Sequence, residues 1–225
     1  MKCAAIIFPG SSHDLYEMVK ECLNLDVDLV WYKDTNLDHY DLLLLSGGFS
    51  YGDYLRPGAL AARTEILAQI CEKAAQGTPI LAIGNGFQIL LEAGLLPGAM
   101  LINEDINFIC QNKNLIVRNN QTFFTTAYDQ NEVISIPIAH GEGCYYCDDQ
   151  TLAQLEKNNQ IVFTYQDNPN GSVGNIAGIV NEQGNILGMM PHPERALETI
   201  LGSEDGLRLF QSMITNWREK HVTNA

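Results

Sequence analysis

The chain has 225 residues, of which 46% are hydrophobic and 18% are charged. This is the composition of a globular protein that can bury a core without disulfide bonds. The formal net charge of −14 argues against nucleic acid or an anionic membrane as a partner, because their phosphates would repel it. No apolar run in the sequence approaches the length that spans a bilayer.

The first half of the chain alternates between apolar runs and segments of helical composition. The apolar runs predict buried strands over residues 3–8, 27–32, 41–46 and 80–83. Between them, residues 14–23 and 59–76 are predicted to be helical. Runs that are apolar throughout are typical of parallel strands covered on both faces. This alternation of strands and helices predicts an α/β fold with a mostly parallel sheet wrapped by helices.

The second half has shorter strand-like runs, separated by turns rich in asparagine and glycine. These runs predict strands over 114–117, 122–126, 133–138, 161–165 and 177–180. The segment 180–185 predicts a hairpin turn that leads into a strand over 186–190. An amphipathic helix is predicted over 204–220. No linker or repeat interrupts the chain, so we expect one domain over 1–225.

The six cysteines are scattered and form no pattern typical of disulfides. Only Cys144 and Cys147 have the spacing of metal ligands, and no second pair accompanies them, so we predict no metal site. Unpaired cysteines favour a reducing compartment, and the cytoplasm is the expected location.

The apolar run at 80–83 ends at Gly84 and continues with helical composition from Phe87. A strand that turns sharply into a helix exposes the residue at the turn, beside the helix N-terminus. Free N–H groups and partial positive charge there favour a thiolate and an oxyanion. This is the pattern of a nucleophile elbow, but glycine stands at the nucleophile position. Far downstream, His192 and Glu194 have the spacing of a base and its orienting carboxylate.

A glycine-rich turn follows the predicted strand at 41–46. The backbone N–H groups of Gly47, Gly48 and Phe49 are expected to face a developing oxyanion, since glycine lets the main chain approach a ligand closely. Alone, such a turn is more often a plain loop at a strand end. In combination with the elbow and with His192, it predicts a site for acyl transfer.

Seven short blocks carry a resemblance to a known family. They lie at residues 9–11, 47–56, 85–90, 94–98, 139–143, 170–172 and 188–195. Together they are similar to the glutaminase (PurQ-type) subunit of phosphoribosylformylglycinamidine synthase, a class I (triad) glutamine amidotransferase. The Gly-Phe-Ser-Tyr-Gly-Asp-Tyr-Leu-Arg block and the His-Gly-Glu-Gly block are specific to this subfamily. The resemblance runs the whole length of the chain.

The resemblance implies a flavodoxin-like three-layer sandwich with an added antiparallel β section. It also implies hydrolysis of L-glutamine to glutamate and ammonia in de novo purine biosynthesis. The ammonia would pass through a channel to a large synthetase subunit, often bridged by a small PurS-type subunit. ATP, Mg²⁺ and formylglycinamide ribonucleotide would bind the synthetase, so no cofactor is expected on this chain.

The resemblance also assigns roles by position. His192 would be the general base and Glu194 the carboxylate that fixes its tautomer. The N–H groups of Gly48 and Asn85 would form the oxyanion hole.

Four further residues are implied to bind the substrate, namely Phe49, Gln88, His140 and Gly141. The alternative for Gln88 is a glutamine exposed on a helix. The alternative for His140 is a turn histidine without a ligand.

The chain departs from the family at the elbow. The family has Gly-x-Cys-Asn-Gly-Phe-Gln, whereas this chain has Ala82, Ile83 and Gly84 before the same Asn-Gly-Phe-Gln. Loss of a triad nucleophile costs on the order of 10⁶ in kcat, so we expect no glutamyl thioester. Other departures, at 12–13 and at Pro57, favour natural divergence over one deliberate replacement.

Two other functional hypotheses remain. A non-catalytic scaffold or regulatory subunit of an ammonia-using synthetase would keep the fold and the interface but not the chemistry. A hydrolase with a different nucleophile is disfavoured, because no Ser or Cys occupies the elbow. Retention of His192, Glu194, Gly48 and Gln88 favours an amidotransferase whose activity was lost recently or was removed by engineering.

Overall fold

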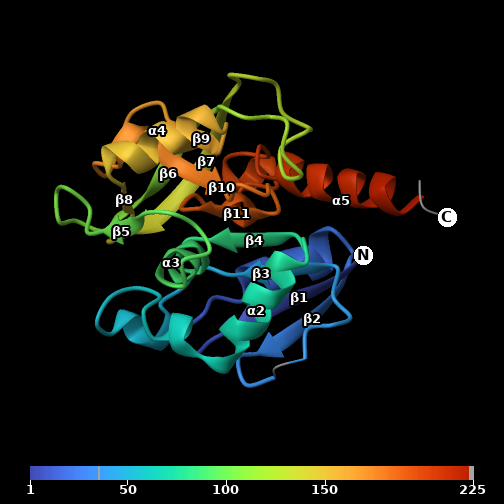
Figure 1. Cartoon of the computed structure of the whole chain (residues 1–225). Helices are drawn as coiled ribbons and strands as arrows, with labels where there is room; N and C mark the ends of the chain where they lie inside the picture. The colour runs from blue at the N-terminus through green and yellow to red at the C-terminus, as the bar shows by residue number, and fades with distance from the viewer. Residues whose placement is uncertain (35, 223–225) are drawn as a thin grey trace.

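The computed structural model describes residues 1–34 and 36–222. Within them, nine strands form one sheet in the order β2-β1-β3-β4-β11-β10-β9-β6-β7 (Figure 1). The first five run parallel, and the remaining pairings are antiparallel. The strands in that order are Asp26–Trp31, Lys2–Ile7, Leu42–Leu45, Ile80–Ile83, Ile186–Met189, Ile176–Val180, Ile161–Tyr165, Ile109–Val117 and Val133–His140. A separate small sheet pairs β5 (Ala99–Leu101) with β8 (Cys144–Tyr146).

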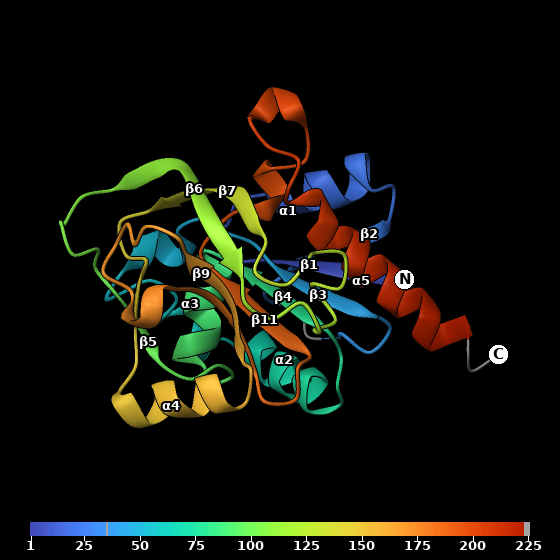
Figure 2. The ribbon, with the colours of Figure 1, turned by 90° about the horizontal axis from the view of Figure 1, so that it is seen from above.

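The helices cover both faces of the large sheet. They are α1 (Asp14–Glu17, continued by a π-helical turn Met18–Cys22), α2 (Glu65–Ala75), α3 (Asn85–Glu92), α4 (Asp149–Lys157) and α5 (Leu207–Val222). Figure 2 shows α1 and α5 on one side of the sheet and α2, α3 and α4 on the other. The fold is therefore a three-layer α/β sandwich with an antiparallel extension, which confirms the fold class expected from the sequence.

Alternation along the parallel strands builds two cores, one on each face. In β1, Cys3 and Ala5 join the core that includes Leu15 of α1. Ala4 and Ile6 point the other way, into the core that includes the apolar face of α2. Successive residues of a strand face opposite sides, so a strand covered on both faces must be apolar throughout. This explains why these runs lack the alternation of a half-exposed strand.

The predicted elements agree with the structure in most places, and one is wrong. Residues 122–126 form turns rather than a strand. The hydroxyls of Thr122 and Thr125 bond each other, and Thr122 also accepts from the N–H of Phe124 at 3.2 Å. Such local side-chain bonds compete with strand pairing. The burial of Phe124 explains the misleading apolar signal.

Two predicted helices have different bounds, and three elements were missed. The helix predicted over 59–76 is interrupted at Thr64, whose backbone is extended, and the last helix starts at Leu207 rather than at 204. Helix α4 and strands β5 and β8 were not predicted from the sequence. Within the described residues, every helix is too short or too polar to cross a bilayer.

Candidate active site

The turn between β4 and α3 places position 84 against an imidazole. Gly84 has φ 53° and ψ −110°, a left-handed conformation that disfavours side chains. A Cβ built on it would lie 3.2 Å from Cε1 and 3.3 Å from Nε2 of His192. The α3 helix approaches β3 so closely that a Cβ on Gly86 would overlap the carbonyl of Leu45. The structure thus brings together positions 84 and 192, which are far apart in sequence.

His192 and Glu194 form a buried pair in the turn after β11. Their Nδ1 and Oε1 atoms lie 2.7 Å apart, and the two residues are 3% and 6% exposed. The carboxylate accepts the Nδ1 proton, so the lone pair of Nε2 faces position 84. The main-chain N–H of His192 donates to Pro137 on β7 at 2.8 Å. Gly47 leaves room for the ring, because a Cβ there would come within 2.8 Å of Cε1.

The glycine-rich turn after β3 is hydrogen-bonded to the loop after β1. Gly48 has φ +116°, and a Cβ on it would lie 2.6 Å from the carbonyl oxygen of Gly10. The N–H of Phe49 donates to that same oxygen at 2.9 Å. The expectation that the Phe49 N–H faces an oxyanion is therefore wrong. In the described part of the chain, the N–H groups of Gly48 and Asn85 have no protein acceptor, and both residues line one cavity with Gly84.

A chain of hydrogen bonds through side-chain amides connects the elbow helix to the loop after β7. The side chain of Asn85 accepts from the N–H of Ser50 at 3.1 Å and donates to Gln88 at 2.9 Å. Gln88 in turn donates to the carbonyl of Glu142 at 2.6 Å. Gln88 is 6% exposed, so it is not the exposed helical glutamine considered as an alternative. Its amide binds protein groups at both ends in this structure.

His140 is held in a single tautomer by Asn103. The amide nitrogen of Asn103 donates to the carbonyls of Asn107 and His140, so its Oδ1 is the atom that faces Nδ1 of His140, at 3.0 Å. Nδ1 must then carry the proton, and Nε2 is left as an acceptor. Nε2 is buried without a hydrogen-bond partner. Burial and the nearby His192 lower the pKa of His140 to about 4, so the ring is neutral.

These groups line a cavity of about 140 Å³, which we call the elbow cavity. The predicted residues that line it are Gly48, Phe49, Gly84, Asn85, Gln88, His140, Gly141 and His192. Glu194 stands behind His192 and does not reach the wall. None of the described residues in its lining is a cysteine or a serine, so this wall offers no substitute thiol or hydroxyl.

Several residues of the cavity wall were not predicted from the sequence, among them Asp53, Pro57, Phe108 and Glu142. Asp53 lies inside the 47–56 block, so an acidic residue in that block could have been predicted to line the site. Phe108 carried no signal, because it reaches the wall from a loop between β5 and β6. Pro57, noted as a departure from the family, also lines the cavity.

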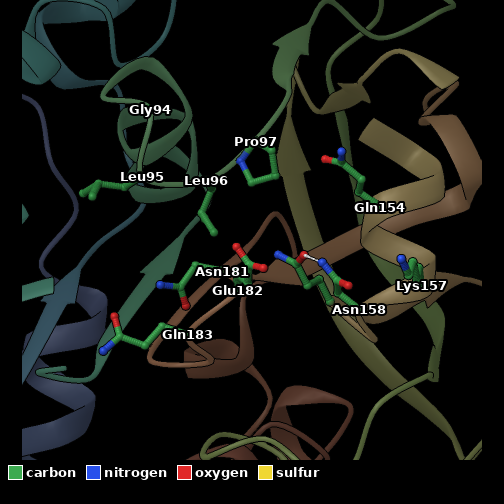
Figure 3. A pocket seen from close by; sticks show the side chains of 11 residues that line it. Gly94, Leu95, Leu96, Pro97, Gln154, Lys157, Asn158, Asn181, Glu182 and Gln183 are labelled. Atoms are coloured by element: carbon green, nitrogen blue, oxygen red, sulfur yellow. Dashed lines mark hydrogen bonds between the residues drawn. The ribbon is translucent and has the colours of Figure 1, made fainter. Parts of the chain in front are cut away.

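Other cavities lie apart from the elbow or beyond His192. One of about 370 Å³ shares Gly48 and His192 with the elbow cavity and continues to Ser12 and Arg195. A larger one, of about 920 Å³, lies between the loop after α3, the end of α4 and the turn at 181–183 (Figure 3). Its wall holds neither residue 84 nor a histidine. The buried side-chain amide of Gln160 in this wall donates a hydrogen bond to the carbonyl of Val180 at 2.9 Å, so its role is structural. Among the described residues no cluster of metal ligands occurs.

Comparisons with known proteins agree with this geometry. A family model described as a CobB/CobQ-like glutamine amidotransferase domain matches residues 13–217. The chain is similar to one in the structure of PurLQS from Thermotoga maritima, with 46% identity, a TM-score of 0.87 and coverage of 95% of this chain and 97% of that chain.

Two more distant structures share the fold. One is a glutamine amidotransferase from Thermotoga maritima, with 19% identity, a TM-score of 0.60 and coverage of 99% and 92%. The other is the glutaminase domain of Trypanosoma brucei CTPS with bound acivicin, with 12% identity, a TM-score of 0.60 and coverage of 96% and 94%.

Proposed function

The chain belongs to the CobB/CobQ-like glutamine amidotransferase family, and from this premise we propose that it is the amidotransferase subunit of phosphoribosylformylglycinamidine synthase. The likeness to a PurLQS chain at 46% identity over nearly the whole length supports this assignment. The proposed partners are a large synthetase subunit, which would hold ATP and Mg²⁺, and a small PurS-type subunit. The six cysteines are all free, which supports a cytoplasmic location.

The observation that carries the proposal is the imidazole of His192 facing position 84. A nucleophile at that position would pass its proton to Nε2, and Glu194 would stabilise the imidazolium. The carbonyl oxygen of glutamine would then accept from the N–H groups of Gly48 and Asn85. His192 would afterwards donate the proton to the departing ammonia.

In this chain the first of these steps has no attacking atom. Glycine offers neither sulfur nor oxygen, and the loss of a triad nucleophile costs roughly 10⁶ in kcat. Gly84 therefore favours a second candidate, a subunit that binds the synthetase and glutamine but does not hydrolyse the amide at a useful rate.

Turnover of the complex with the large and small subunits tests both candidates. We expect ammonia to support synthesis of the amidine product, whereas glutamine supports it only with Gly84→Cys. Failure of the chain to associate with the synthetase would overturn the assignment. Equal turnover with glutamine and ammonia in the unchanged complex would overturn the conclusion that the site is disarmed.

A further inference from the structure

The elbow cavity has two carboxylates in its wall and no lysine or arginine among the described residues that line it. The carboxylates belong to Asp53 and Glu142. Burial and the like charge of Glu142 raise the pKa of Asp53 to about 6. Two negative charges in a partly buried site without a cationic side chain are unfavourable, and a positively charged ligand group would reduce their repulsion. The chemistry of this wall thus selects a cation.

The backbone around Asp53 is held in a conformation that costs free energy. Tyr51 and Asp53 both have φ 54°, in the left-handed region. Such outliers persist only where surrounding contacts impose them, and they gather at ligand sites. Here Ser50 donates its N–H to the side chain of Asn85 at 3.1 Å. The residue that follows the elbow therefore fixes the loop that presents Asp53.

The position of Asp53 relative to the elbow suits the length of glutamine. Its Oδ1 accepts a hydrogen bond from Nδ2 of Asn85 at 3.4 Å, so the carboxylate is about one side chain away from the elbow turn. In glutamine, three carbon atoms separate the amide carbon from the α-nitrogen. An amide held at position 84 would place the α-nitrogen near this carboxylate.

A buried polar atom in the same wall lacks a hydrogen-bond partner. His140 is 4% exposed, and its Nε2 is an acceptor without a hydrogen bond. A buried acceptor left unpaired costs free energy unless a ligand donates to it. An ammonium group carries three N–H donors, so it can satisfy this acceptor and a carboxylate together.

We propose that Asp53 binds the α-ammonium group of glutamine and that Nε2 of His140 accepts one of its N–H bonds. This inference rests on the proposed function, because it takes glutamine as the ligand of the elbow cavity. Asp53 is then a specificity residue that rejects amides without an α-amino group. Glu142 adds negative charge to the same end of the cavity.

Titration calorimetry on the purified chain at pH 8 tests the inference. Because Gly84 cannot form a thioester, binding is measured without turnover. The two ligands are glutamine and glutaramate, which is glutamine without its α-amino group. We expect the unchanged chain to bind glutamine roughly tenfold to a hundredfold more tightly, the range for hydrogen bonds to charged groups.

The variant Asp53→Asn keeps the shape of the side chain and tolerates the left-handed backbone as aspartate does. It should weaken glutamine binding by a similar factor while leaving the affinity for glutaramate unchanged. Asp167→Asn, at an exposed position outside the cavity, is the matched control and should change neither affinity.

Equal affinity of the unchanged chain for the two ligands would overturn the inference and leave the proposed function standing. A parallel loss of both affinities in Asp53→Asn would also overturn it, because that result indicates a structural role. Absence of glutamine binding, by the chain alone and in its complex with the synthetase, would overturn the proposed function as well. The comparison of ligands on the unchanged chain needs no variant, so misfolding of Asp53→Asn would not hide the answer.

Discussion

At position 84 the backbone and the neighbouring imidazole make opposite demands. The left-handed φ of 53° favours glycine. A Cβ would also lie 3.2 Å from the ring of His192, which is shorter than an ordinary van der Waals contact. The chemistry, in contrast, needs a side chain at that point. Elbow nucleophiles accept this strain because the strained position exposes them to the substrate.

The variant Gly84→Cys should therefore gain activity and lose stability. We expect glutaminase turnover in the complex to rise by several orders of magnitude, and the free energy of unfolding to fall by roughly 1–3 kcal/mol. Steady-state assays and thermal melts measure the two effects. Gly94→Cys is the control, since Gly94 is also left-handed at φ +72° but has open space around it. It should lose stability without gaining activity.

The unchanged chain should resist covalent glutamine analogues at the elbow. A reagent that captures an active-site thiol finds none in the wall of the elbow cavity. Mass spectrometry after incubation should show no adduct on the peptide that contains residue 84. A stoichiometric adduct on this peptide would contradict the proposed loss of function.

His140 should make the fold sensitive to acid. The folded chain keeps this ring neutral down to about pH 4, whereas the unfolded chain takes up a proton near pH 6.5. The free energy of unfolding should therefore fall by up to roughly 3 kcal/mol as the pH drops from 6.5 to 4. Urea denaturation at pH 7 and at pH 4.5 should show this fall in the unchanged chain and a smaller one in His140→Gln. His39→Gln, at an exposed position, should leave the fall intact.

At the scale of elements, the close contact between α3 and β3 depends on the absence of a side chain at Gly86. Alanine at Gly86 would favour the helix intrinsically by about 1 kcal/mol, but its Cβ would overlap the carbonyl of Leu45. We expect Gly86→Ala to lower the free energy of unfolding by roughly 1–3 kcal/mol, as for other overpacked sites. Chemical denaturation measures this, and an unchanged or raised stability would show that α3 can shift away from β3.

How far sequence could predict these elements depends on what stabilises each of them. The parallel strands were evident because both of their faces are buried, which leaves an uninterrupted apolar run. Helix α4 was missed because, among its residues with a described burial, only Leu155 is buried. Its start is set by Asp148, which accepts from the N–H of Thr151 at 2.8 Å, a capping signal that hydrophobic periodicity does not detect.

The site was predictable where chemistry demands a residue type at fixed spacing. His192 and Glu194 belong to one turn, so their pairing is local and can be read from sequence. Asp53 and Phe108 reach the elbow cavity from loops on different elements, and only the folded chain brings them together. The N–H of Phe49 was predicted as an oxyanion donor, but in the folded chain it already donates a hydrogen bond to the carbonyl of Gly10. Such a bond within the protein could not be predicted from the sequence.

At the scale of the whole molecule, the two cores extend across the large sheet. One core contains Cys3 of β1 together with Leu115 of β6 and Phe210 of α5. Parallel and antiparallel sections are thus buried against common side chains, and β10–β11 pairing joins them directly. Neither section can unfold without exposing apolar surface of the other.

We accordingly expect the chain to unfold in one cooperative step. Differential scanning calorimetry should give a single transition whose calorimetric and van't Hoff enthalpies agree. Two resolved transitions would contradict the expectation of one domain over 1–225. Partial proteolysis that released a stable fragment of residues 1–100 would lead to the same conclusion.

The absence of a thiol from the described wall of the elbow cavity has a consequence for the cell. Thiolates at positively polarised helix ends are the first sites that peroxide and other electrophiles attack. Here such reagents meet no thiol at the elbow, where the sulfur in the described wall is the thioether of Met190. The exposed thiols, Cys22 and Cys110, lie on the outer surface. Oxidative stress would therefore form neither a sulfenic acid nor a disulfide in the wall of this ligand pocket, and methionine sulfoxide at Met190 is the sulfur oxidation open to it.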